Sequence, residues 1–122
     1  AMHKMYVMYN LKPGVTMEQY RLWSKEIDQR ITPGQPGMIR FEIYEMLGSE
    51  TGGEPFLQIV EDIEVEDFDA WMETTRQEGM AYVESTLPSL IDESSRKIMY
   101  GKRIVADLPN GSRPPVPSLG FK

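Results

Sequence analysis

The sequence predicts an α+β fold with the element order β-α-β-β-α-β, and three observations support this prediction. Residues 56–83 read as a short apolar strand, an acidic turn and an amphipathic helix. Residues 5–31 show the same strand-to-helix pattern, and a glycine-rich hairpin joins the two halves. Right-handed crossovers in both halves would place four strands in one antiparallel sheet, with both helices on the same face.

The first half begins with a β-prone run over residues 4–11. This run is apolar on both faces, which predicts a strand buried on both sides. A Lys-Pro-Gly turn at residues 12–14 ends it. Thr16 followed by Gln19 forms a capping-box pattern, which marks the start of a helix. Apolar residues then recur on one helical face, at Tyr20, Trp23, Ile27 and Ile31.

The centre of the chain is predicted as a loop, a strand and a hairpin. Residues 32–37 hold two prolines and two glycines, which exclude regular structure there. From Met38 to Leu47 the polarity alternates with period two, which predicts a strand. Residues 48–55 contain three glycines and read as a hairpin loop. The polar side of the strand could line a pocket or contact another subunit; it consists of Arg40, Glu42, Tyr44 and Met46.

The second half repeats the pattern. Phe56–Asp62 is predicted as a strand, and acidic residues follow it at the start of a helix, where they favour helix stability over a metal site. That helix continues to Val83, with Gly79 as its weak point. After a short turn at Pro88, Arg96–Val105 is predicted as the last strand. The helix presents apolar and small residues at helical spacing: Phe68, Trp71, Met72, Thr75 and Val83.

The chain divides into one domain, residues 1–106, and a C-terminal segment, residues 107–122. This segment holds four of the nine prolines and little periodic hydrophobicity, so we expect neither a core strand nor a core helix there. Two alternatives remain. The segment is either disordered or an extended arm on a partner subunit, anchored by Val116, Leu119 and Phe121.

Composition excludes several classes of function. With 122 residues, 40% hydrophobic and 26% charged, the chain has the composition of a globular domain, and no apolar run approaches the roughly 18 residues of a membrane span. The absence of cysteine excludes disulfides and thiolate chemistry and favours a cytoplasmic location. A net charge of −6 opposes binding to nucleic acid. We expect His3 to be solvated in a mobile terminus, the basic residues from Arg96 to Arg103 to lie on a solvated edge strand, and no metal or cofactor to be bound.

The predicted sheet has one face without helices. Such a face needs cover, and the same face of a second copy, related by a two-fold axis, is the simplest cover. The sequence therefore predicts a homodimer.

Four features of the chain are typical of a known superfamily: Leu11–Val15, Trp23 followed by Asp28, Pro55 before the third strand, and the strand-to-helix join Val60–Trp71. With them the sequence resembles the dimeric α/β-barrel superfamily, in which two ferredoxin-like sheets face each other to form a barrel with the helices outside. Within it, the chain looks most like the RedY/HapK-like proteins of pigment and indole-alkaloid biosynthesis. The resemblance covers residues 5–105 and implies an activity in natural-product metabolism.

The candidate catalytic residues are Glu61 first, Glu42 second, and Asn10. A carboxylate in an apolar cleft can act as a general acid or base, although either glutamate could instead lie at the surface or an interface. Asn10 and Trp71 fall near the Asn and Trp of monooxygenases in the same superfamily, while Ala81 stands where haem-degrading members have an iron-ligating His. Asn10 could equally be a strand-end residue. The candidate substrate-binding residues are Trp71, Trp23, Tyr44, Arg40 and Tyr100, with core packing as the alternative for both tryptophans.

Three functions follow as hypotheses. The leading one is a cofactor-independent enzyme of specialised metabolism that acts on an aromatic intermediate, such as an indole or pyrrole derivative, by proton transfer and cyclisation. The second is a cofactor-free monooxygenase of the antibiotic-biosynthesis type. The third is a non-catalytic ligand-binding or assembly protein. The expected ligand is a small, aromatic, hydrophobic molecule.

Overall fold

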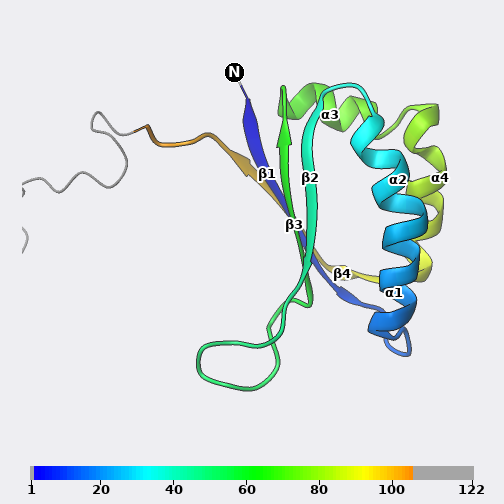
Figure 1. Ribbon diagram of the computed structural model, residues 1–122, viewed down its shortest axis with the longest axis vertical. Helices are drawn as coiled ribbons and strands as arrows, with labels where there is room; N and C mark the ends of the chain where they lie inside the picture. The colour runs from blue at the N-terminus through cyan, green and yellow to red at the C-terminus, as the bar shows by residue number, and fades with distance from the viewer. Residues whose placement is uncertain (1, 106–122) are drawn as a thin grey trace, which may run out of the picture.

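The computed structural model describes residues 2–105, which form a four-stranded antiparallel sheet with helices on one face (Figure 1). The strands are β1 (His3–Leu11), β2 (Met38–Glu45), β3 (Ile59–Val65) and β4 (Ile91–Gly101), in the order β2-β3-β1-β4. The predicted α+β, ferredoxin-like class is confirmed. The C-terminal segment, residues 107–122, for which an arm and a disordered tail were the alternatives, lies outside the described residues.

The first helical segment is continuous but changes its winding. Helix α1 (Met17–Trp23) begins with the predicted capping box, in which Thr16 and Gln19 bond to each other's backbone. A π-helical turn, η1 (Ser24–Asp28), follows, and then α2 (Gln29–Ile31) and the 3₁₀ turn η2 (Thr32–Gly34). The π-helical turn has wider winding than an α-helix and shifts the residues after it around the helix axis.

The prediction of one helix up to Val83 was wrong. The structure has two helices, α3 (Phe68–Thr74) and α4 (Glu78–Thr86), followed by the 3₁₀ turn η3 (Leu87–Ser89). The break falls before Gly79, which lies inside α4. The glycine instead allows close packing, because a Cβ there would collide with the side-chain amide of Gln35.

The predicted strands Phe56–Asp62 and Arg96–Val105 were also wrong at both ends, and β3 ends at Val65 and β4 at Gly101. β3 begins at Ile59, and Phe56 is 88% exposed in the hairpin loop. β4 begins at Ile91, five residues before the predicted start, because Ile91 pairs with Leu11 at the end of β1. The polar stretch between Ile91 and Arg96 has little β propensity by itself, so its pairing depends on the neighbouring strand.

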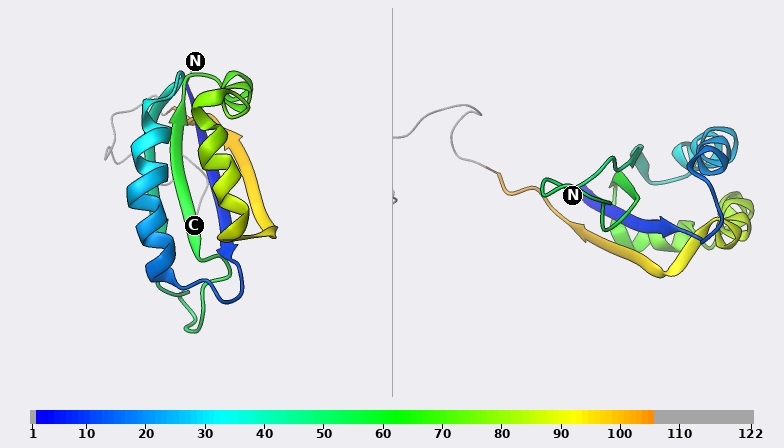
Figure 2. Two further views of the ribbon diagram at one scale, coloured as in Figure 1. Left: turned by 90° about the vertical axis from the view of Figure 1, so that its right-hand side faces the viewer. Right: turned by 90° about the horizontal axis from the view of Figure 1, so that it is seen from below.

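Only one face of the sheet is buried in the single chain. Both helical segments run side by side across this face, and the opposite face carries no helix (Figure 2). Met5, Val7, Tyr9 and Leu11 of β1 are buried under the helices, whereas the residues between them are half-buried. The prediction that β1 is buried on both sides is therefore wrong for one copy. Within residues 2–105 no helix is long and apolar enough to cross a membrane.

The open sheet face is defined here by the side chains that point away from the helices. On this face Lys4 lies 2.6 Å from Asp62, and Arg40 lies 2.9 Å from Glu64, so its charges are largely paired. Half-buried and exposed apolar groups lie beside these pairs. From the strand register, the open sheet face consists of Lys4, Tyr6, Met8, Arg40, Glu42, Tyr44, Val60, Asp62, Glu64, Lys97 and Met99.

Candidate functional site

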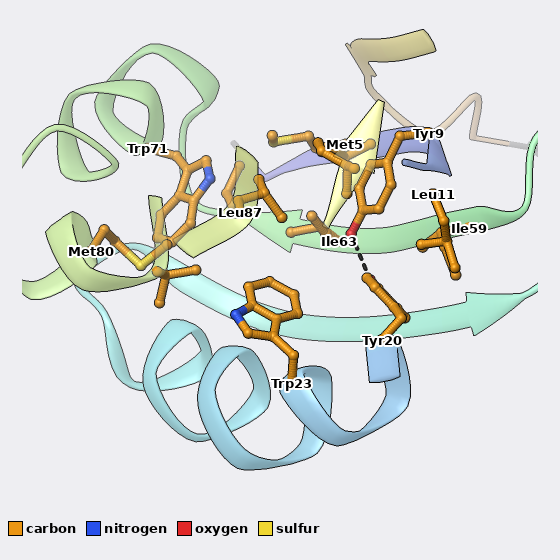
Figure 3. Close-up of a cluster of buried hydrophobic side chains, with 14 residues drawn as sticks. Met5, Tyr9, Leu11, Tyr20, Trp23, Ile59, Ile63, Trp71, Met80 and Leu87 are labelled. Atoms are coloured by element: carbon orange, nitrogen blue, oxygen red, sulfur yellow. Dashed lines mark hydrogen bonds between the residues drawn. The ribbon is translucent and has the colours of Figure 1, made fainter. Parts of the chain in front are cut away.

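A cavity of about 140 Å³ lies between the sheet and the helices. Its wall combines side chains from β1, β3 and β4 with side chains from both helical segments. Trp23 and Trp71 belong to its aromatic part, and Figure 3 shows both pointing into the space between the sheet and the helices. Four ionisable side chains also belong to the wall: Asp28, Glu61, Glu84 and Arg96.

Glu61 lies on β3, at a position whose neighbours in the strand alternation, Ile59 and Ile63, are buried. The side chain is therefore carried under the helices, and the residue is only 8% exposed. Tyr9 donates a hydrogen bond of 2.7 Å to Oε2, and the hydroxyls of Tyr9 and Tyr20 lie 2.6 Å apart (Figure 3 shows the tyrosine pair). The other carboxyl oxygen, Oε1, has no hydrogen-bond partner within residues 2–105.

The environment of Glu61 favours its protonated form. Burial raises the pKa of the Glu61 carboxyl to about 8, and the negative charge of Asp28 adds to this, while the Tyr9 hydrogen bond and Arg96 oppose it. Burial also raises the pKa of Tyr9 and of Tyr20, so both hydroxyls stay protonated and available as donors. A carboxyl with a pKa near 8 is present in both forms around neutral pH, as a general acid or base requires.

Asp28 is the second buried carboxyl of the cavity, and it is 4% exposed at the end of the π-helical turn. Thr32, one turn later, donates a hydrogen bond of 2.6 Å to Oδ1. Burial raises the pKa of Asp28 to about 6, although the Thr32 hydrogen bond opposes the shift. Within residues 2–105 no three His, Asp or Glu side chains are grouped so that they could hold a metal ion.

Trp23 and Trp71 are both core residues and cavity residues. Trp23 is 8% exposed, and its Nε1–H donates to Oγ1 of Thr86 at 2.9 Å. Trp71 is 3% exposed on α3, which Asp67 caps through the backbone N–H of Ala70. The two alternatives from the sequence, core packing and pocket lining, thus apply to the same side chains.

The other candidate residues lie away from the cavity. Arg40, Glu42 and Tyr44 are on the open sheet face, where Arg40 and Tyr44 both donate to Glu42. The side chain of Asn10 accepts a hydrogen bond from the backbone of Gln58 at 3.0 Å. Tyr100 faces the helices but stacks on Phe68 of α3, with ring centroids 3.9 Å apart. None of these residues lies beside Glu61, and their roles stay predictions.

Two expectations for charged residues were wrong. His3 begins β1, and its Nδ1 accepts a hydrogen bond of 2.9 Å from the backbone N–H of Phe68, so it is not part of a mobile terminus. Arg96 lies on the edge strand β4, as expected, but its side chain is not solvated, because it is only 26% exposed and forms part of the cavity wall. The signal for Arg96 was its period-two spacing with Ile98, which places both on the helix-covered face.

The geometry defines a ferredoxin-like α+β protein with an ionisable, aromatic cavity beneath its helices. The sequence model of the REDY-like protein HapK matches residues 3–104, and the chain belongs to this family. The predicted resemblance is confirmed, and the family is linked to natural-product biosynthesis.

Solved structures support the fold assignment. HapK from Hahella chejuensis is 16% identical, with a TM-score of 0.68, over 89% of this chain and 99% of that one. An EthD-family protein from Bacillus halodurans is 15% identical, with a TM-score of 0.66, over 85% and 100% of the chains. A dimeric protein of unknown function with a ferredoxin-like fold, from Bacteroides fragilis, is 14% identical, with a TM-score of 0.62, over 84% and 96%. At these identities the likeness shows the fold alone. No curated protein matches the chain.

Proposed function

We propose that this protein is a cofactor-independent enzyme of specialised metabolism that transfers a proton on an aromatic intermediate, derived from pyrrole or indole, and so promotes its cyclisation. The observation that carries the proposal is the Glu61 carboxyl, which is buried in the cavity and has a pKa raised to about 8. Membership of the REDY-like HapK family supports the metabolic context.

The chemistry follows from the two oxygens of Glu61. Oε2 is held by Tyr9, which fixes the orientation of the carboxyl group, and Oε1 has no partner within residues 2–105. An ionised Glu61 can accept a proton from a substrate carbon at Oε1 and return it to another atom of the same substrate. Tyr9 would lower the free-energy cost of the carboxylate form by donating to it, and Tyr20 is hydrogen-bonded to the Tyr9 hydroxyl.

The size of the cavity limits what it can enclose. Its volume of about 140 Å³ is below the range of about 300–1,000 Å³ for drug-sized ligands. It is close to the roughly 150 Å³ of an apolar cavity that holds one benzene ring. We therefore propose that one aromatic ring of the substrate enters between the helices and the sheet.

The test uses 2-acetylpyrrole, a one-ring probe with exchangeable methyl protons beside its carbonyl group. We expect the protein to accelerate exchange of these protons for deuterium in D₂O, measured by proton NMR, at equal rates with and without oxygen. Binding without faster exchange would support the non-catalytic alternative, which the small cavity also favours. Turnover that requires oxygen would support the monooxygenase alternative. Absence of both exchange and binding would refute the proposal.

We also propose that the chain forms a homodimer through the open sheet face. Structural relatives include dimeric proteins with this fold. Tyr44 and Met99 are 47% and 55% exposed on this face in the single chain. A depression of about 700 Å³ beside it is lined by Met8, Val60 and the hairpin loop. Burial of this apolar area by a second copy would supply the free energy of association.

Light scattering at micromolar concentration should give the mass of two chains. Val60→Arg, in the middle of the open sheet face, is expected to give the mass of one chain, because it would bury an unpaired charge. Leu22→Arg is the matched control, since Leu22 is 64% exposed on α1, away from this face. A monomeric mass for the unmodified protein would contradict the dimer.

A further inference from the structure

Arg96 carries an unsatisfied donor in the wall of the cavity. Its Nε atom is enclosed by the protein, and it is the one fully enclosed side-chain nitrogen or oxygen within residues 2–105 that has no hydrogen-bond partner. Buried donors in proteins are almost always paired, so such an atom requires an explanation. The contact of Arg96 with Glu93 does not explain the unpaired atom. It involves Nη1 rather than Nε, and at 4.0 Å from Oε2 of Glu93 it is at the outer limit of an ion pair.

The position of Arg96 connects this donor to the candidate site. Arg96 and Ile98 of β4, Val7 of β1 and Glu61 of β3 all belong to the cavity wall. The positive charge of Arg96 lowers the pKa of each of the three carboxyls Asp28, Glu61 and Glu84, although burial raises each pKa more strongly. None of these carboxyls accepts a hydrogen bond from Arg96. The donor therefore has no acceptor within residues 2–105, and it belongs to a side chain of the cavity wall.

We propose that Nε–H of Arg96 donates a hydrogen bond to a neutral carbonyl oxygen of the aromatic substrate and holds that carbonyl group beside Glu61. This inference rests on the proposed function, because it names the substrate class for the same cavity. Because Nε–H has no partner within residues 2–105, a ligand that packs against it must offer an acceptor of its own.

The charges of the wall decide between a neutral and an anionic acceptor. Three carboxyl groups face one guanidinium group, so a carboxylate or phosphate ligand would meet more negative than positive charge. A ketone, aldehyde or amide oxygen accepts the hydrogen bond without adding charge. A protonated amine or a hydrocarbon ring has no lone pair to offer and would leave Nε–H unpaired, which disfavours both.

The carbonyl group also suits the chemistry of Glu61. Proton abstraction from the carbon beside the carbonyl breaks a C–H bond and forms the O–H bond of protonated Glu61. The electron pair moves onto the carbonyl oxygen, where Arg96 stabilises the enolate charge. Return of a proton from Glu61 restores the acid–base balance, and no oxidant or reductant is needed. The enolate carbon can instead attack a second carbonyl group of the same substrate, which forms the C–C bond of a ring and breaks the C=O π bond. The resulting alkoxide takes the proton held by Glu61, so the step leaves a hydroxyl group and restores the carboxylate.

The test compares 2-acetylpyrrole with 2-ethylpyrrole, which has a similar shape but no acceptor oxygen. We expect the acetyl compound to bind the unmodified protein at least about tenfold more tightly, measured by calorimetry, since a hydrogen bond to a charged donor is worth about that factor. Arg96→Met is expected to abolish this difference and to leave the affinity for 2-ethylpyrrole unchanged. Arg103→Met, at an exposed position after β4, is the control and should retain the difference.

Each outcome separates this inference from the proposed function. Equal affinity of the unmodified protein for both compounds would refute the role of Arg96, but it would not contradict the proposal that the cavity binds an aromatic ring. Binding of neither compound would refute the proposed function as well. Tighter binding of pyrrole-2-carboxylate than of 2-acetylpyrrole would overturn the choice of a neutral oxygen. If Arg96→Met does not fold, the ¹⁵N NMR signal of Arg96 Nε in the unmodified protein should still shift with the acetyl compound and not with the ethyl compound, and no shift would refute the hydrogen bond.

Discussion

Glu61→Gln is expected to slow the exchange of the 2-acetylpyrrole methyl protons by about 10²–10⁴-fold, the range that one positioned acid or base contributes. The amide of glutamine has nearly the same shape and can still accept the hydrogen bond from Tyr9, but it cannot take up a proton. The loss should therefore appear in the rate of exchange, measured by NMR in D₂O, while the affinity for the probe changes little.

Glu42→Gln is the matched control for this prediction. Glu42 is the other carboxylate that the sequence favours, but it lies on the open sheet face and is bonded to Arg40 and Tyr44. We expect this variant to exchange the probe at the unmodified rate. If Glu42→Gln slowed proton exchange as much as Glu61→Gln, the result would contradict this prediction and indicate that the reaction takes place on the open sheet face.

The free energy of unfolding is expected to fall as the pH rises from about 5 to 8. In the folded protein the pKa of Glu61 is raised from the ordinary value of 4.5 to about 8, so between these values the folded state holds a proton that the unfolded state has released. Raising the pH therefore favours unfolding, by at most about 1.4 kcal/mol per pH unit for one proton. Asp28, with its pKa raised to about 6, contributes in the same direction over the lower part of this window.

Urea unfolding at several pH values, with the protein concentration held constant, measures this dependence. Glu61→Gln should reduce the slope, because glutamine does not titrate, and the variant should gain stability relative to the unmodified protein as the pH rises. Glu54→Gln, at an exposed position in the hairpin loop, should leave the slope unchanged. A slope that is the same in all three proteins would show that Glu61 is ionised in the folded state throughout this range.

Much of the fold was predictable because it depends on local patterns. The capping box at Thr16, the alternation in β2 and the glycine-rich hairpin each act over a few residues. The start of β4 was not predictable in this way, because Asp92 pairs with Asn10 across a bulge and the pairing depends on a distant strand. The break between α3 and α4 likewise has no proline to mark it.

The site was predictable only in part, for a related physical reason. A glutamate that replaces an apolar residue in the alternation of Ile59 and Ile63 is visible in the sequence, and this marks Glu61. Arg96 belongs to a strand that is separated from β3 by β1, so its approach to Glu61 depends on the whole sheet order. A charge count along the chain places Arg96 with its basic neighbours instead, and these neighbours are exposed.

The π-helical turn at Ser24–Asp28 determines which side of the helix carries Asp28. A π-helical turn corresponds to an α-helix with one inserted residue. Loss of one residue there would restore an ordinary helix and rotate Asp28 by about 100° relative to Trp23, since an α-helix has 3.6 residues per turn. A relative with this deletion would keep the sheet, the helices and Glu61, but it would lose the buried carboxyl that helps to raise the pKa of Glu61. The length of this segment is therefore a marker for members of the family that share the acid–base character of the cavity.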